Sequence, residues 1–265
     1  HSKFIRPDYA FLLNITNDHL DWHGNMSNYT NSKLKIFINQ KKNQFSLTNE
    51  KLKKTFKKRK FLGKLIVPKE KNYKKIKNKI KNDYLKLNIN NENMNFVYTF
   101  SRLLKISKKN FIAAINSFIG LPHRYEIFLK KKNIVFINDS KATSFVSSKF
   151  ALSNSKNVYW VLGGLPKKND RISLGKIKKN IIKCYIVGKN TNFFQKQVQN
   201  KINFSITTNF RKTLFTILKD IQSSNVKENT ILLSPAAASY DQFKNFEKRG
   251  NEFKKLSQIY ARKYI

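Results

Sequence analysis

The pattern of apolar and polar residues after residue 120 alternates between two periods. Short apolar runs of the length of buried strands occur at 134–137, 158–162, 181–187 and 231–233. Stretches with helical spacing lie near 144–153, 191–200, 209–223 and 241–263. Strands that alternate with helices are typical of a parallel sheet covered by helices. We therefore predict a Rossmann-like α/β domain with a mostly parallel sheet over residues 121–265.

Residues 1–120 give fewer strand signals. The apolar run 9–15 has the length of a strand, and Ser27 can cap the helix that follows it. Residues 40–85 are Lys-rich and give no clear pattern, whereas apolar residues recur at helical spacing up to residue 118. Gly120-Leu121-Pro122 should stop these helices. We place a hinge there, between a first domain over residues 1–120 and a second over 121–265.

Polar or small residues follow several of the predicted strands. The run 134–137 leads into Asp139, Ser140, Lys141 and Thr143, Gly163-Gly164 follows the next strand, and 234–239 follows another. Ligands of open α/β sheets bind beyond the carboxyl ends of the strands, so these loops should meet at one crevice. Taken alone, the first loop could also be a polar turn that caps a helix, and Gly-Gly a simple tight turn.

The run 9–15 also ends in side chains that can bind metals. Asp18, His19, Asp21 and His23 are close together, but their spacing fits no closed zinc set. One interpretation is a Mg²⁺ or Mn²⁺ site with one or two protein ligands. The other is a polar loop in which His packs on Trp22.

Composition narrows the class of protein. The chain has 265 residues, 40% of them hydrophobic, with 22 Phe and 11 Tyr, which is ample for two cores. The net charge of +39 would ordinarily indicate a nucleic-acid partner, but the Lys residues are spread along the chain, so nucleic acid is not the expected partner. The single Cys184 lies in an apolar run, which suits a reducing compartment. Without an apolar span near 20 residues or a leader pattern, we expect a cytoplasmic protein with no membrane association.

Certain segments resemble the Mur ligases. These are 14–21 (Asn-Ile-Thr-Asn-Asp-His-Leu-Asp), 121–126 (Leu-Pro-His-Arg-Tyr-Glu), 136–143 (Phe-Ile-Asn-Asp-Ser-Lys-Ala-Thr) and 232–250. The last is the most specific, because its Ser-Pro-Ala stretch continues into Asp-Gln-Phe-Lys-Asn-Phe, as in the members that add D-glutamate. The resemblance extends from about residue 5 to the C-terminus, and in 40–88 it is one of length and general character.

The resemblance implies an ATP-dependent amide ligase of peptidoglycan precursor synthesis. In such an enzyme the carboxylate of UDP-N-acetylmuramoyl-L-alanine is phosphorylated to an acyl phosphate, which the amine of D-glutamate then attacks. The implied cofactors are ATP and Mg²⁺, and the enzyme is expected to be a monomer. Residues 1–120 would be part of the central ATPase domain, and residues 121–265 the C-terminal domain that closes over the substrate.

The resemblance also implies site residues. His19 would help to bind Mg²⁺, and Lys33 would be the family's carbamoylated lysine, a modification that reverses its charge. Arg124 and Asp139 would bind the nucleotide, with Asp139 at the ribose hydroxyls, and Asn93 would lie near the adenine. The implied D-glutamate pocket consists of Lys141, Thr143, Lys167, Ser239, Tyr240 and Phe246. Two carboxylates of an incoming amino acid need such cations and hydroxyl donors. Lys141 joins His19 and Lys33 as an expected catalytic residue.

The sequence departs from the family pattern in several places. It has no Gly-x-x-x-x-Gly-Lys-[Ser/Thr] phosphate loop, and Trp22 and Tyr240 are local substitutions. We therefore expect the chain to be the second half of a ligase whose phosphate loop, Mg²⁺-binding Glu and uridine-binding domain precede His1. Alone, it should turn over little or no substrate.

Alternatives from other classes remain at this stage. One is a basic nucleic-acid-binding module on a ligase-derived fold. DNA binding with a steep salt dependence would support it. Another is a non-catalytic nucleotide or amino-acid binder made of residues 121–265, which calorimetry with D-glutamate would test.

Overall fold

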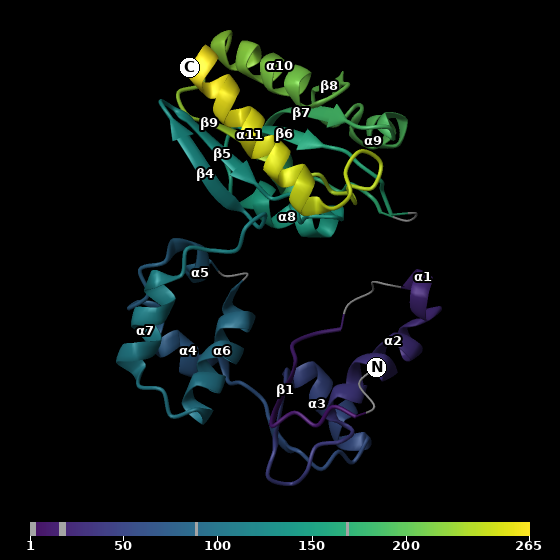
Figure 1. The fold of residues 1–265 in the computed structure, drawn as a ribbon, viewed down its shortest axis with the longest axis vertical. Helices are drawn as coiled ribbons and strands as arrows, with labels where there is room; N and C mark the ends of the chain where they lie inside the picture. Colours follow the sequence, from purple (N-terminus) through teal and green to yellow (C-terminus); the bar gives the residue numbers. More distant parts are fainter. Residues whose placement is uncertain (1–3, 16–19, 88–89, 168–169) are drawn as a thin grey trace. The chain divides into compact units, whose positions relative to one another are not determined.

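The computed structural model of the protein describes residues 4–15, 20–87, 90–167 and 170–265. The chain divides into two compact units, His1–Phe118 and Ile119–Ile265, called unit 1 and unit 2 below. Figure 1 shows the elements of each unit, which are considered one unit at a time.

Unit 1 contains a small parallel sheet and a group of helices. Its three-stranded sheet has the order β1-β2-β3. The strands are β1 (Tyr9–Leu12), β2 (Phe45–Thr48) and β3 (Lys64–Ile66). Its helices are α1 (Leu20–His23), α2 (Met26–Leu34), the 3-10 turn η1 (Lys35–Phe37), α3 (Glu50–Lys58), α4 (Glu70–Lys77), α5 (Asp83–Lys86), α6 (Asn91–Leu103) and α7 (Lys108–Ser117).

Two features of unit 1 differ from the sequence-based predictions. The strand is shorter than the apolar run 9–15, because β1 ends at Leu12 where pairing with β2 stops. Ser27 does not cap α2. Asn25 does, because it has an extended backbone before the helix and its side chain accepts a hydrogen bond from the Asn28 N–H, whereas Ser27 already lies in the first turn.

Unit 2 contains a six-stranded sheet with the order β4-β5-β9-β6-β7-β8. Its strands are β4 (Glu126–Lys131), β5 (Ile134–Asn138), β6 (Val158–Leu162), β7 (Ile181–Val187), β8 (Phe204–Thr207) and β9 (Asn229–Leu233). Its helices are α8 (Phe145–Ser153), the 3-10 turn η3 (Gly175–Asn180), α9 (Thr191–Val198), α10 (Phe210–Gln222) and α11 (Phe246–Tyr264). All neighbouring strands are parallel except β4 and β5, which confirms the predicted mostly parallel α/β domain.

Helices cover both faces of this sheet. Alternate residues of β6 point to opposite faces, so Trp160 packs in a cluster with residues of α8 and α9, and Tyr159 in a cluster with residues of α10 and α11. Figure 1 shows α10 and α11 side by side on one face. A sheet buried on both faces explains why β6 is apolar and why both β6 and β9 are buried along their whole length.

The order of the strands determines which of the loops that follow them lie next to one another. Strand β9 lies between β5 and β6 and is parallel to both, so the carboxyl ends of these three strands are neighbours. The loops that follow them carry the polar and small residues noted in the sequence. Helix α11 starts at Phe246, later than the expected residue 241, because Asn245 caps it and residues 241–245 form a turn.

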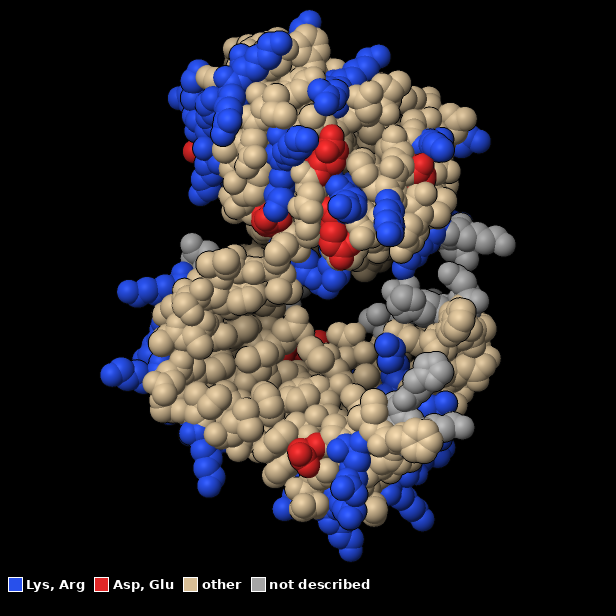
Figure 2. All heavy atoms as spheres, in the orientation of Figure 1, with Lys and Arg blue, Asp and Glu red and all other residues tan. Residues whose placement is uncertain are grey.

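The surface of both units carries many cations. Figure 2 shows Lys and Arg side chains scattered over the visible face of each unit, with few carboxylates among them. They do not gather into one stripe on this face. None of the helices formed by the described residues is long and apolar enough to span a bilayer.

Candidate functional site

The loops after β5, β9 and β6 are joined to one another by backbone hydrogen bonds. The Asp139 N–H donates to the Leu233 carbonyl (2.7 Å), and the Gly163 N–H donates to the Pro235 carbonyl (3.0 Å). Leu165 and Ala238 pair as an isolated antiparallel bridge. Gly163 has a φ of 137°, and a Cβ there would meet the Val187 carbonyl oxygen at 1.9 Å. Glycine at position 163 is thus required for the close approach of this loop to the end of β7.

Asp139 is the buried carboxylate of this cluster. Its side chain is 7% exposed, and its Oδ1 accepts a hydrogen bond from the Tyr125 N–H (3.1 Å). Its Oδ2 accepts one from the Ser234 hydroxyl (2.7 Å). Burial raises the pKa of Asp139 to about 6, against the hydrogen bonds and the Arg124 guanidinium, which lower it. The carboxylate is therefore mostly ionised at neutral pH and is held by neutral donors.

The segment before β4 runs alongside Asp139 in an unusual conformation. His123 and Tyr125 have left-handed φ values of 63° and 46°. The Lys141 N–H donates to the His123 carbonyl (3.0 Å), and the Tyr125 N–H reaches Asp139, so the segment is held from both sides of Arg124. Such strained backbone persists only where surrounding contacts enforce it, and it is frequent at functional sites. It presents the exposed Arg124 next to Asp139.

A buried polar network supports this segment. The Asn138 side-chain amide lies 2.9 Å from His123 Nδ1 and donates to Glu126 Oε2 (2.9 Å). Glu126 also accepts from Lys254 Nζ of α11 (2.7 Å). Burial lowers the pKa of His123, which favours the neutral imidazole. Gly250 of α11 leaves room for this ring, because a Cβ there would lie 2.2 Å from His123 Nδ1.

Arg249 of α11 connects the loop after β5 with the loop after β9 by hydrogen bonds. It is 3% exposed, and its Nη2 donates to the carbonyls of Ser140 (2.7 Å) and Ala237 (2.9 Å). Its Nε donates to the Ser140 hydroxyl (3.0 Å), which itself donates to the Phe246 carbonyl (2.8 Å). Burial lowers the pKa of Arg249 to about 10, so it stays cationic at neutral pH. This buried cation makes the electrostatic potential at the two loops more positive.

The network residues and Arg249 were missed as site residues by the sequence analysis. One signal for Arg249 was available: it lies on the helical stripe that also contains Phe246, Phe253 and Leu256, where an apolar residue is expected. A cation on such a stripe needs buried partners, and the partners are the strand-end carbonyls.

The expected D-glutamate residues of unit 2 surround this buried cluster at different depths. Lys141 is exposed, with its Nζ 4.7 Å from the centre of the Phe246 ring. Ser239 is buried, and its carbonyl accepts hydrogen bonds from the N–H groups of Gln242 and Phe243, whereas Tyr240 is 71% exposed. Phe246 also lies 5.9 Å from His123, ring centre to ring centre. The loops after β5 and β9 thus contribute neighbouring groups.

Thr143 and Lys167 belong to the same strand-end loops. Thr143 is half-buried between β5 and α8, two residues before Phe145, whose N–H donates to Asp170 Oδ2 (2.7 Å). Lys167 is exposed on the loop after β6, and its carbonyl accepts from the Asp170 N–H (3.0 Å). Asp170 therefore links the loop after β6 to the start of α8.

The residues expected in the first domain lie in unit 1. Lys33 is exposed on α2, with its Nζ 5.3 Å from the centre of the Tyr29 ring, and Asn93 is exposed on α6. His19 lies outside the described residues, as does Asp18. Within the described ranges no three His, Cys, Asp or Glu side chains gather as a metal site. Lys33 as an ammonium repels cations, so the described residues alone do not fit Mg²⁺.

Comparison with known proteins adds sequence evidence to this geometry. Residues 1–118 match the family model for the Mur ligase middle domain. A UDP-N-acetylmuramoylalanine–D-glutamate ligase from Wolbachia sp. subsp. Brugia malayi (strain TRS) is 36% identical over a region that covers 94% of this chain and 53% of that protein. A protein of the same name from Rickettsia felis is 34% identical over a region that covers 97% of this chain and 62% of that protein. Over nearly its whole length the chain is similar to Mur ligases.

This similarity confirms the resemblance carried by the four sequence motifs. The chain spans between about half and about three-fifths of the length of these curated relatives. It also shares the Mur ligase fold. The MurF ligase from Thermotoga maritima in complex with ADP covers 100% of this chain with a TM-score of 0.65 at 16% identity, and 64% of that chain is covered.

A second solved structure gives the same result for the fold. A MurF crystal structure from Acinetobacter baumannii has a TM-score of 0.66 at 12% identity. The match covers 98% of this chain and 61% of the MurF chain. The alternative of a nucleic-acid-binding module has no support from these Mur ligase comparisons or from the scattered cations of Figure 2.

Proposed function

We propose that this chain takes part in the ATP-dependent addition of D-glutamate to UDP-N-acetylmuramoyl-L-alanine. The single observation that carries the proposal is the similarity, over 94–97% of the chain, to proteins named as ligases of this substrate pair. The segment 232–250, which forms the loop after β9 and the start of α11, carries the most specific motif. The reaction belongs to cell-wall precursor synthesis and would take place in the cytoplasm.

The nucleotide would be bound by Arg124 and Asp139. Asp139 has each carboxylate oxygen fixed by one neutral donor, which occupies only part of its acceptor capacity. Ribose hydroxyls are donors that suit the remainder. The strained backbone on either side of Arg124 orients a guanidinium toward the same region, where it can contact phosphate or stack on a base. A MurF ligase of this fold was crystallised with ADP, which agrees with this use.

D-glutamate would be bound by side chains of the three loops. Its two carboxylates need cations, which Lys141 and Lys167 supply, and hydroxyl donors, which Thr143 and Ser239 supply. Phe246 would pack against the ligand's methylene groups, and Tyr240 would set the width of the pocket. The buried Arg249 adds positive potential beneath these loops without contacting solvent.

The reaction proceeds in two balanced steps. The carboxylate of the UDP-precursor attacks the γ-phosphorus of ATP, which gives an acyl phosphate and ADP. The amine of D-glutamate then attacks the acyl carbon, and the C–O bond to phosphate breaks as the amide forms and the amine loses a proton. Cationic Lys141 can stabilise the anionic charge that develops on the acyl and phosphate oxygens.

Three further assignments in unit 1 are part of the proposal. Asn93 would lie near the adenine, His19 would bind Mg²⁺, and Lys33 would be carbamoylated. Carbamoylation would convert an exposed ammonium into an anionic oxygen donor, which is what a cation site needs. Mass spectrometry of the intact chain tests this, because a carbamate adds about 44 Da and is lost on acidification.

Phosphate release by the full-length product of the gene that encodes this chain tests the proposal. We expect ATP-dependent release only when both UDP-N-acetylmuramoyl-L-alanine and D-glutamate are present. Lys183→Ala is a matched control, because Lys183 lies on β7 and pairs with Asp220 away from the strand-end loops. Release with L-lysine in place of D-glutamate would reassign the substrate, and no release with any amino acid would contradict the proposal.

A further inference from the structure

Ser234 is the first residue after β9 and connects Asp139 to the core of unit 2. It is completely buried, and its hydroxyl donates to Asp139 Oδ2 at 2.7 Å. Its carbonyl accepts hydrogen bonds from the Trp160 indole Nε1 (2.7 Å) and from the Ser148 hydroxyl (3.3 Å). Trp160 and Ser148 are themselves fully buried. The backbone of Ser234 is thus fixed by β6 and α8, and its side chain transmits that position to Asp139.

Among the described residues, Ser234 is the side-chain donor of this carboxylate. The other donor is the Tyr125 N–H, which belongs to the backbone and reaches the opposite oxygen. A carboxylate with one donor on each oxygen cannot rotate without losing a hydrogen bond. The plane of the Asp139 carboxylate is therefore set jointly by the segment before β4 and by the loop after β9.

We propose that Ser234 is a positioning residue that orients the Asp139 carboxylate and keeps it available as an acceptor for ligand hydroxyls. The identity of the ligand as a nucleotide ribose rests on the proposed function. The geometry of the hydrogen bond does not, because it joins two side chains of unit 2.

The electrostatic surroundings of Asp139 make this hydroxyl important. Burial raises the pKa of Asp139 to about 6, and the Ser234 hydrogen bond is the first of the contributions that lower it. The segment before β4 adds the Arg124 cation and the Tyr125 N–H, whereas β9 contributes the neutral Ser234. Removing the hydroxyl would favour the protonated carboxyl, which accepts fewer hydrogen bonds.

The first experiment measures this directly in the 265-residue chain. Titration of the side-chain carboxyl carbon of Asp139 by NMR should give a midpoint near pH 6 in the wild type. Ser234→Ala should raise the midpoint by about one pH unit. Ser148→Ala is the matched control, because it removes a hydrogen bond to the Ser234 carbonyl without touching Asp139, and it should leave the midpoint in place. An unchanged midpoint in Ser234→Ala would overturn the proposal.

The second experiment measures ADP affinity of the full-length gene product from pH 6 to pH 8.5. If ADP binds the ionised carboxylate, the change in ionisation caused by Ser234→Ala should weaken binding about fivefold at pH 6 and about twofold at pH 7, whereas at pH 8.5 only the smaller loss from the changed orientation should remain. In an Asp139→Asn background, Ser234→Ala should have no further effect. A loss of affinity that is equal at every pH and persists in that background would show a merely structural role and overturn the proposal.

The two experiments separate this inference from the proposed function. If Asp139→Asn leaves ADP affinity unchanged, the nucleotide role of Asp139 is contradicted. The NMR midpoints then still decide whether Ser234 controls the carboxylate.

Discussion

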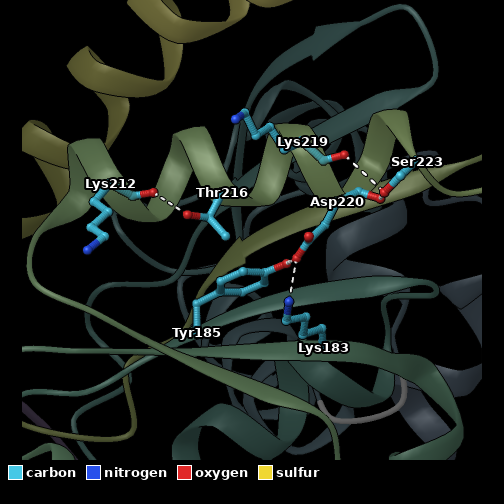
Figure 3. Close-up of polar contacts among 7 residues, drawn as sticks. All are labelled: Lys183, Tyr185, Lys212, Thr216, Lys219, Asp220 and Ser223. Carbon is cyan, nitrogen blue, oxygen red and sulfur yellow. Dashed lines mark hydrogen bonds and ion pairs between the residues drawn. The ribbon is translucent and has the colours of Figure 1, made fainter.

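Unit 2 contains two carboxylates that are held in opposite ways. Asp139, at the carboxyl ends of the strands, is 7% exposed and accepts hydrogen bonds from a serine hydroxyl and a backbone N–H. Asp220, on α10, accepts from Lys183 Nζ (2.7 Å) and from the Tyr185 hydroxyl (2.5 Å). Figure 3 shows the Asp220 carboxylate between the Lys183 ammonium and the Tyr185 ring, with α10 above β7.

The difference separates a structural carboxylate from one that is kept for a ligand. Asp220 has a cation in contact, and burial together with this carboxylate raises the pKa of Tyr185, so the phenol remains a donor. The charge and the hydrogen-bonding capacity of Asp220 are thus satisfied by residues of unit 2. Asp139 is more deeply buried but has only neutral donors in contact, at a cost in stability that folding alone does not require. Such a cost is expected where a site serves binding.

The largest expected effect is on stability and its pH dependence. Because the pKa of Asp139 rises from 3.8 to about 6 on folding, its contribution is fully favourable below pH 3.8 and is lost as pH rises through 6. Asp139→Asn should therefore raise the free energy of unfolding of unit 2 by up to about 3 kcal/mol at pH 8, with little change at pH 4. Urea unfolding followed by the fluorescence of buried Trp160 measures this. A less stable Asp139→Asn variant at pH 8 would break the comparison.

The second effect compares Lys167 of the proposed D-glutamate pocket with Lys183 of the Asp220 ion pair. Lys167→Ala in the full-length gene product should raise KM for D-glutamate about 30-fold, because one ligand carboxylate loses its cation. Lys183→Ala should change this KM less than about twofold, because that ammonium is paired with Asp220. Steady-state kinetics at saturating ATP decide the point. Equal effects of the two substitutions would remove the distinction between them.

Whether the sequence predicts a strand depends on whether that strand is buried on both faces or lies at an edge of the sheet. The strands of 134–137, 158–162, 181–187 and 231–233 were found because they are largely buried on both faces and, apart from Lys183, consist of apolar residues. Strands β4 and β8 were missed. The two lie at the edges of the sheet, are only partly buried and contain Glu126, Lys130, Lys131 and Thr207. Their strand character comes from pairing with a neighbour, which no local pattern encodes.

The site also contains residues that the sequence predicts and contacts that it does not. The loop residues Asp139, Lys141 and Ser239 were expected from motifs, and the structure brings their loops together at adjacent strand ends. The hydrogen bond from Ser234 to Asp139 joins residues 95 positions apart, and no spacing rule predicts such a contact. The buried Arg249 could have been suspected from its place on an apolar stripe, but its partners could not.

The third effect tests Asp220 by the same substitution used for Asp139. Asp220→Asn should lower the free energy of unfolding by about 1 kcal/mol at pH 7, because a partly exposed ion pair and a hydrogen bond to Tyr185 are weakened. The sign is opposite to that expected for Asp139→Asn. The same urea titration measures both variants, and a stabilised Asp220→Asn would contradict the structural role of this carboxylate.

The smallest effect concerns Tyr125. Its hydroxyl donates to the Asn154 carbonyl (2.8 Å), whereas its backbone N–H holds Asp139. Tyr125→Phe should therefore cost about 0.5–1 kcal/mol of stability and leave the titration midpoint of Asp139 in place. A shifted midpoint would show that the phenol, and not the backbone, positions the carboxylate.

The most direct test of the central claim compares ADP with 2′,3′-dideoxy-ADP by calorimetry on the full-length gene product and its Asp139→Asn variant. If Asp139 is the acceptor for ribose hydroxyls, the wild type should bind ADP about tenfold more tightly than the dideoxy nucleotide at pH 8, which corresponds to about 1.4 kcal/mol. The Asp139→Asn variant should bind the two nucleotides with nearly equal affinity. A variant that keeps the full preference for ADP would contradict the claim that the strand-end carboxylate of unit 2 is reserved for the nucleotide.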